Sequence, residues 1–317
     1  MKHGNLALDC CRASKGEPLR RYHEQSLGCS VSKVAIVTDS TASAPPELLS
    51  NYDITIVPLL IAVGDKTFRD GVDITAAEVY RLMRQENGLP KTSAPSPAVF
   101  LESYRTLSER ADSILCITLT SRYSMAFESA VQAREMAREE LPDTAIEVID
   151  SRTSAGALGL IVLEAASVAS QGADLSHVAQ AARAMIPRVN LLAVMDTLRY
   201  LARGGRIGRA AAWAGSLFNI KPILETSTTT GYTEPVERPR TKPQAVRRLL
   251  ELMEERVGDS PIRAIVHHAD APREGEELRA QVASRFNCTD LYLTEFTPLM
   301  GAHTGPGLLG VSFLAEE

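Results

Sequence analysis

The chain has 317 residues, 44% hydrophobic and 23% charged, which are the proportions of a globular protein with one large or two average domains. A formal net charge of −5 and an aromatic content of 5% argue against a nucleic-acid-binding protein, and no apolar run is long enough to span a bilayer. Five cysteines without a Cys-x-x-Cys pair predict a reduced, cytoplasmic protein: Cys10, Cys11, Cys29, Cys116 and Cys288.

Residues 1–32 have neither helical nor strand periodicity, and they lack the apolar segment of a secretory signal. We interpret them as a disordered extension or as the result of a start codon assigned too far upstream. Cys10, Cys11 and His23 lie in this segment, but no further ligand completes a metal-binding spacing. We therefore predict no metal site, and we expect the first domain at residues 33–172.

Within residues 33–172, a buried strand, a hydroxyl-rich turn and a helix follow one another three times. We expect the strands at 34–38, 113–120 and 146–149. Strands that alternate with helices predict a parallel sheet, and ligands bind beyond the carboxyl ends of such strands. The hydroxyl residues at these ends are Ser40, Thr41, Ser43, Ser121, Ser124 and Ser151. We predict that they contribute to one rim that holds an anion.

A strand, a polar turn and a helix are expected after the first repeat. Residues 54–63 form an apolar run typical of a strand, and residues 68–73 are polar and turn-like. The spacing of apolar residues then predicts a helix over 74–85, with Thr75 as its N-cap.

Residues 91–97 place three hydroxyl groups beside two prolines, directly before a helical pattern at 98–110. The second proline, Pro97, suits the first position of this helix, and Ser96 suits the N-cap. Thr92 and Ser93 are expected in an extended loop because a proline follows them closely. Two fixed hydroxyls beside a positive helix end suit a carboxylate or a phosphate, although a helix cap without a ligand is the alternative.

The second half of the chain, residues 173–317, predicts a separate α/β domain with a mixed or antiparallel sheet. A hairpin around Thr230-Gly231 is the main signal, because its two strands must pair antiparallel. We expect helices at 173–186, 198–201, 210–218, 241–256 and 274–286, and strands at 189–195, 222–225, 232–238, 262–267, 291–296 and 309–314. The boundary between the two domains is expected near residues 170–175.

Histidines and glycines near the C-terminus raise two possible sites. Gly305–Gly310 matches G-x-G-x-x-G, but no helix follows it, so we predict no dinucleotide site. His303 is expected in a glycine-rich loop at 300–310, where it either donates to an anion or lies exposed. His267 and His268 lack further metal ligands, and we interpret them as partly buried residues at a strand end.

Three arginines, Arg203, Arg206 and Arg209, alternate with glycines after the short helix near residue 200. They suit a phosphate, an acidic partner protein or a solvated helix end, and their spacing does not decide among these. No G-x-S-x-G motif is present, and hydroxyl groups are abundant where general bases are scarce. This composition favours a binding site over a catalytic one.

Taken together, several segments make the chain resemble the DegV family of bacterial fatty-acid-binding proteins. They occur in the order of that family and span almost all of the chain from Val34 onward: Val37–Ser43, Phe68–Asp73, Thr92–Pro97, Asp150-Ser151, Leu198–Ile207 and His303–Gly307. The resemblance implies a two-domain α/β fold that holds one long-chain fatty acid between its domains, without a cofactor, a metal or catalytic residues.

The resemblance also implies specific residues and a partner. The carboxylate would be bound by Thr92, Ser93, Ser124 and His303. The supporting rim would comprise Asp39, Ser40, Thr41 and Thr304. A separate fatty acid kinase would phosphorylate the bound acid, and Arg203 and Arg206 resemble the residues tied to that kinase.

One segment departs from the family pattern, and one alternative function stays open. Where the family usually has Leu-Ser-Gly-Thr, this chain has Tyr123, Ser124, Met125 and Ala126, so a methionine replaces a glycine near the ligand. The alternative to a carrier is a hydrolase or transferase that acts on an acyl ester or a phosphate at the same rim.

Overall fold

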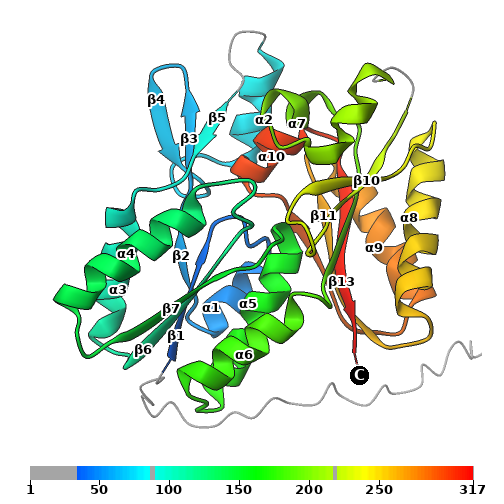
Figure 1. The fold of residues 1–317 in the computed structure, drawn as a ribbon. Helices are drawn as coiled ribbons and strands as arrows, with labels where there is room; N and C mark the ends of the chain where they lie inside the picture. The colour runs from blue at the N-terminus through cyan, green and yellow to red at the C-terminus, as the bar shows by residue number, and fades with distance from the viewer. Residues whose placement is uncertain (1–33, 86–89, 217–219, 317) are drawn as a thin grey trace, which may run out of the picture. The chain divides into compact units, whose positions relative to one another are not determined.

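The computed structural model describes residues 34–85, 90–216 and 220–316, shown as coloured ribbon in Figure 1. The interpretation of residues 1–32 and the helical prediction at Phe218 lie outside the described residues. The predicted division into two domains at residue 172 remains a prediction.

The first half contains the predicted parallel sheet, in the strand order β2-β1-β6-β7. Its strands are β1 (Val34–Asp39), β2 (Thr55–Val57), β6 (Ser113–Thr118) and β7 (Ala145–Asp150). Every residue of β6 is buried, as expected for a central strand covered on both faces. The three predicted strand-turn-helix repeats are confirmed, and β2 extends the sheet at one edge.

Helices cover both faces of this sheet (Figure 1). They are α1 (Pro46–Asn51), α3 (Pro97–Ser108), α4 (Ala126–Glu140), α5 (Ala155–Ser170) and α6 (Leu175–Met185). Helices α3 and α4 pack on one face, and α5 and α6 pack on the other. The predicted N-terminal α/β architecture is therefore confirmed.

A small antiparallel sheet, β4-β3-β5, carries the predicted hydroxyl pair. Its strands are β3 (Leu60–Val63), β4 (Lys66–Arg69) and β5 (Lys91–Ser93). The predicted single run at 54–63 is two strands in different sheets, because Pro58 cannot donate to a ladder. The predicted turn at 68–73 was placed two residues too early, since Arg69 still belongs to β4.

Helix α2 (Ala76–Arg84) follows β4 and begins as predicted. The Thr75 side chain accepts a hydrogen bond from the Glu78 backbone N–H at 3.3 Å, and the Glu78 carboxylate accepts from the Thr75 N–H at 2.8 Å. This capping box fixes the start of the helix. Ser96 occupies the N-cap position of α3 as predicted, but its side chain makes no capping hydrogen bond.

The second half contains a six-stranded mixed sheet in the order β10-β9-β8-β13-β11-β12, which confirms that prediction. Only the β11–β12 pair is parallel. The strands are β8 (Asn190–Val194), β9 (Ile223–Thr226), β10 (Thr233–Glu237), β11 (Ile262–His268), β12 (Cys288–Glu295) and β13 (Leu309–Ala315).

Helix α5 connects the two large sheets. It contacts β1 and β6 of the parallel sheet as well as β8, β11 and β13 of the mixed sheet. A helix that packs between two sheets is expected to be apolar on all sides. The residues of its first two turns, 155–162, are all buried. Helices α8 (Lys242–Val257) and α9 (Pro272–Arg285) cover the other face of the mixed sheet.

One prediction in the second half is wrong, and the structure specifies the type of another predicted helix. Residues 300–304, expected in a loop, belong to helix α10 (Pro298–Thr304), whose N-cap Thr297 accepts a hydrogen bond from the Met300 N–H. Gly305 ends this helix with a φ of 76°, a conformation that a side chain disfavours. The helix predicted after α7 (Arg199–Arg203) is a 3₁₀-helix, η1 (Gly208–Ser216), which begins two residues before the predicted start.

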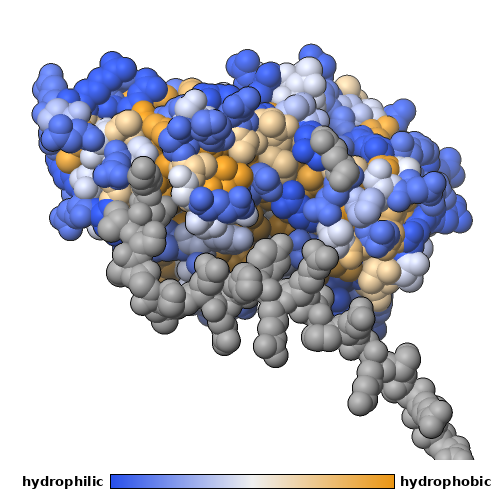
Figure 2. Space-filling view, turned by 90° about the horizontal axis from the view of Figure 1, so that it is seen from below, coloured by the Kyte–Doolittle hydropathy of each residue, from blue (hydrophilic) through white to orange (hydrophobic). Residues whose placement is uncertain are grey.

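Along the described part of the chain, no helix combines the length and the apolar character that a bilayer span requires. Figure 2 shows one face of the molecule, where hydrophilic residues predominate and apolar residues gather in small patches between them. Large exposed apolar side chains include Val72, 59% exposed, and Met125, 61% exposed. Such a mixture is normal for a protein surface.

Candidate functional site

A cavity of about 90 Å³ lies at the carboxyl ends of the parallel strands. The segment after β6 forms one wall, strands β8 and β9 form another, and α10 forms a third. Its apolar lining consists of Leu59, Leu119, Leu191, Ala193, Met195, Leu201, Leu224, Phe296, Leu299, Met300 and Leu308. The cavity therefore offers mostly hydrocarbon surface, which suits an apolar ligand.

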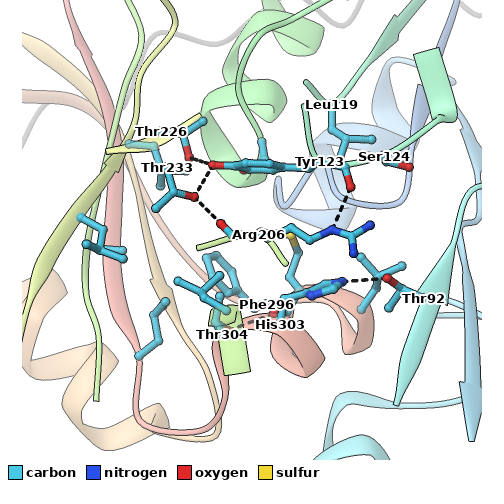
Figure 3. Close-up of a pocket in the computed structure, with 18 of the residues that line it drawn as sticks. Thr92, Leu119, Tyr123, Ser124, Arg206, Thr226, Thr233, Phe296, His303 and Thr304 are labelled. Atoms are coloured by element: carbon cyan, nitrogen blue, oxygen red, sulfur yellow. Dashed lines mark hydrogen bonds between the residues drawn. The ribbon is translucent and has the colours of Figure 1, made fainter. Parts of the chain in front are cut away.

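The four residues predicted to bind a carboxylate all line this cavity. Thr92 on β5 and His303 on α10 are far apart in sequence, yet Thr92 Oγ1 lies 2.7 Å from His303 Nε2 (Figure 3). Ser93 makes no side-chain hydrogen bond with the described residues. Ser124 Oγ accepts a hydrogen bond from the Ala126 N–H at 3.2 Å, which leaves its own hydroxyl hydrogen free. Several hydroxyl donors at this end of the cavity are therefore available to an acceptor.

His303 is an uncharged partner in this group. Burial lowers its pKa to about 4, and the nearby Arg206 cation contributes in the same direction. A neutral imidazole carries one ring N–H, so His303 Nε2 either donates to Thr92 or accepts from it. Gly204 permits the close approach of the α7 end, because a Cβ atom there would lie 2.5 Å from His303 Nδ1.

The Arg206 side chain also lines the cavity, although the resemblance assigned this residue to the contact with a kinase. Its Nε donates to the Tyr123 carbonyl at 2.9 Å, and its Nη1 donates to the Gly204 carbonyl at 2.5 Å. Among the described lining residues it is the one cation. The single lining carboxylate, Glu225, is already paired with Arg256 at 2.6 Å. Arg206 therefore gives the cavity a positive charge at the end where the hydroxyls gather.

A second cluster of hydroxyls was not predicted. Tyr123 OH lies 2.7 Å from Thr233 Oγ1 and 3.2 Å from Thr226 Oγ1, and all three residues line the cavity (Figure 3). Tyr123 follows a hydroxyl-rich strand end, which was a visible signal. The two threonines come from the β9–β10 hairpin, and nothing in their local sequence indicates that they reach Tyr123.

Comparison with known proteins identifies relatives along nearly the whole chain. The family model for the uncharacterised DegV proteins matches residues 33–316. A DegV domain-containing protein of Streptomyces coelicolor is 37% identical over 280 residues, which cover 88% of this chain and 97% of that protein. Protein DegV of Bacillus subtilis is 30% identical over 280 residues, or 88% of this chain and 98% of that protein. The chain belongs to the DegV family.

Solved DegV structures share this fold. A crystal structure of DegV, a fatty acid binding protein from Bacillus subtilis, has a TM-score of 0.81 at 30% identity and covers 90% of this chain and 99% of that one. A DegV family protein from Thermus thermophilus, described for its fatty acid binding, has a TM-score of 0.83 at 29% identity and covers 90% and 100%. The resemblance found in the sequence is confirmed.

The residues of the DegV motif around Asp39 do not line the cavity but lie behind the residues that do. Asp39 accepts hydrogen bonds from Thr41 Oγ1 at 2.6 Å and from the Leu119 N–H at 2.6 Å. Ser40 accepts from the Leu59 N–H at 3.1 Å. These residues of the predicted rim hold the backbone of two lining leucines and do not contact the cavity.

Most of the remaining predicted rim residues of this DegV protein use their hydroxyls within the protein, and Ser121 is bonded to the described residues only through its backbone. Ser43 and Ser151 are buried and bonded to neighbouring carbonyls, and the Ser121 N–H donates to Asp150. Thr304 does line the cavity, but its hydroxyl donates to the Met300 carbonyl of its own helix at 2.9 Å. Met125, which replaces the glycine of the DegV pattern, is 61% exposed and does not line the cavity.

The strand histidine His267 is held by two hydroxyl groups in this DegV protein. His267 is fully buried, with Nδ1 2.8 Å from Thr294 Oγ1 and Nε2 3.0 Å from Ser312 Oγ, whereas partial burial was predicted. Burial lowers its pKa to about 3. Within the described ranges, no three His, Cys, Asp or Glu side chains come close enough to hold a metal ion.

Proposed function

We propose that this chain binds one long-chain fatty acid in the cavity and presents its carboxyl group to a fatty acid kinase. The observation that carries the proposal is an apolar cavity that has free hydroxyl donors and one cation at a single end. The related structures from Bacillus subtilis and Thermus thermophilus, described as fatty-acid-binding, support the same ligand class.

In this proposal the hydroxyls of Thr92, Ser93 and Ser124 bind the carboxylate directly, and His303 supports the site by orienting the Thr92 hydroxyl. His303 Nε2–H donates to Thr92 Oγ1, so the Thr92 hydroxyl hydrogen is free to point at the ligand. Ser93 and Ser124 each add a hydroxyl donor. A hydrogen bond to a charged acceptor contributes about 1.5–3 kcal/mol, so this group fixes the position of the head.

The acyl chain supplies most of the affinity. Each CH₂ removed from water contributes about 0.8 kcal/mol. The cavity of about 90 Å³ is smaller than the roughly 300–1,000 Å³ of typical ligand sites, so a long chain requires lining side chains to move. Met195 and Met300 suit this movement, because methionine is unbranched and adapts its shape readily.

The head group lies near the surface, which supports access by a kinase. A depression lined by Lys91, Arg203 and Tyr200 adjoins the cavity, with which it shares Thr92 and His303. It also shares Arg206, the second arginine that the resemblance assigns to the kinase contact. Arg203 is exposed and Arg206 is half-buried, so we assign the contact with the kinase chiefly to Arg203.

The first experiment is to identify the bound ligand. Native mass spectrometry of the purified chain should show the added mass of one fatty acid, and the delipidated chain should take up labelled palmitate or oleate. A chain that carries no lipid and takes up neither acid would refute the proposal.

The kinase contact needs its own test. With a fatty acid kinase and ATP, Arg203→Glu should slow phosphorylation of the bound acid at least tenfold while leaving palmitate affinity unchanged. Arg273→Glu on α9 is the matched control, since Arg273 is also exposed but lines neither the cavity nor the depression. Equal rates for the Arg203 variant and this control would exclude Arg203 from the contact.

One observation favours the alternative of an acyl hydrolase or transferase. The Thr92–His303 pair has the spacing of a nucleophile and its base. No carboxylate of the described residues orients His303, and its electrostatic neighbour is a cation, Arg206. Turnover of a model acyl ester that disappears in Thr92→Val or Ser124→Ala would support this alternative, whereas the carrier predicts no turnover.

A further inference from the structure

Tyr123 and Thr233 together hold Arg206: Tyr123 binds its side chain, and Thr233 binds its backbone. Its Nε donates to the Tyr123 carbonyl at 2.9 Å, and its own carbonyl accepts from Thr233 Oγ1 at 2.8 Å. Tyr123 OH and Thr233 Oγ1 lie 2.7 Å apart, so these contacts close a ring (Figure 3). The ring joins three segments: the loop after β6, the loop after α7 and the start of β10.

The donor and the acceptor of each hydroxyl hydrogen bond in the ring can be assigned. Thr233 has one hydroxyl hydrogen, and the Arg206 carbonyl takes it. Tyr123 OH must therefore donate to Thr233 Oγ1, and Thr226 donates in turn to the Tyr123 oxygen. Removing the Tyr123 hydroxyl alone breaks the link between the side chain of Tyr123 and the backbone of Arg206. It leaves the Tyr123 carbonyl in place.

The charge of Arg206 has no counterpart inside the cavity. Its guanidinium donates to two carbonyl groups, and Nη2 has no partner among the described residues. His303 is neutral, and the one lining carboxylate, Glu225, is neutralised by Arg256. A carboxylate placed beside Thr92 and His303 would meet Arg206 as its counter-ion, and a partly buried pair of this kind is weakly screened by salt.

We propose that Tyr123 and Thr233 are positioning residues that hold Arg206 as the counter-charge of the ligand, so that the ring selects an anionic head group over a neutral one. This inference rests on the proposed function, because it assumes a fatty acid in the cavity. It assigns the Tyr123 hydroxyl a role that acts through Arg206 and not through direct contact with the ligand.

The test compares palmitate with hexadecanol, which has the same chain and a neutral head. Tyr123→Phe should weaken palmitate binding about tenfold and change hexadecanol binding by less than about threefold. Tyr104→Phe is the matched control: it loses a buried tyrosine hydrogen bond, to the Ala130 carbonyl at 3.3 Å, outside the cavity. Both ligands should bind this control as they bind the wild type.

A double-mutant cycle shows whether Tyr123 acts through Arg206. Arg206→Met should abolish the preference for palmitate over hexadecanol. Adding Tyr123→Phe to this variant should weaken palmitate binding by no more than about a further twofold. Additive losses, or equal losses of palmitate and hexadecanol in Tyr123→Phe, would overturn the inference. If Tyr123→Phe fails to fold, Thr233→Val breaks the same ring and should give the same pattern. Failure of the wild type to bind palmitate would refute the proposed function itself.

Discussion

The Thr92→Val variant tests the carboxylate site most directly, because it removes a hydroxyl without changing the shape of the side chain. In the bound state the variant loses one hydrogen bond to a charged acceptor, about 1.5–3 kcal/mol, which corresponds to a roughly 10- to 150-fold weaker Kd. In the free chain it also leaves His303 Nε2 buried without its partner at 2.7 Å, which destabilises the fold by about 1–3 kcal/mol.

Two measurements separate these effects: calorimetric titration of the delipidated chain with palmitate, and thermal unfolding without ligand. Thr106→Val is the matched control, because its hydroxyl donates to the Glu102 carbonyl on an exposed helix, outside the cavity. The control should change neither quantity. An unchanged palmitate affinity in Thr92→Val would remove Thr92 from the site, and an unchanged melting temperature would show that His303 does not depend on it.

Three further predictions concern pH and space. Burial lowers the pKa of His303 to about 4 and that of His267 to about 3, whereas both are near 6.5 in the unfolded chain. The unfolded chain therefore binds more protons, and the stability of the fold decreases as the pH falls from 7 to 4. Melting temperatures over this range should fall less steeply in His303→Gln, and parallel curves would contradict the shift. Burial raises the pKa of Asp70 to about 6, so Asp70→Asn should gain stability relative to wild type as pH rises from 5 to 8, which chemical denaturation can measure. Ala193→Phe should fill part of the cavity and weaken binding of C18 acids at least tenfold more than binding of C10 acids, and equal losses would place the chain elsewhere.

Local sequence patterns predicted most of the secondary structure, because those elements carry their own signals. The buried runs before residues 39, 118 and 150 are strands, and Thr75 caps helix α2 as expected. Helix α10 was missed because its glycine and its closeness to Gly305 and Gly307 suggested a loop. Thr297 and Pro298, an N-cap followed by a proline, were the signal that identified it.

The contacts inside the site depend on tertiary structure and could not be predicted in this way. Local patterns suggested Thr92, Ser93, Ser124 and His303 separately as anion-binding residues, and the resemblance to a family grouped them into one carboxylate site. The structure brings all four to one cavity. The direction of the Arg206 side chain, toward the cavity and Tyr123, follows from the packing of two loops. The hydroxyls of Thr226 and Thr233 reach Tyr123 across more than 100 residues, and no spacing rule relates such positions.

Strand β13 has a consequence for synthesis on the ribosome. It lies between β8 and β11, although every other strand of that sheet precedes it in the chain. Until Leu309–Ala315 has been translated, the nascent chain holds two separate ribbons, each with one unpaired inner edge. A nonsense mutation just before Leu309 would therefore leave both ribbons open, and we expect the truncated product to be captured by chaperones or degraded.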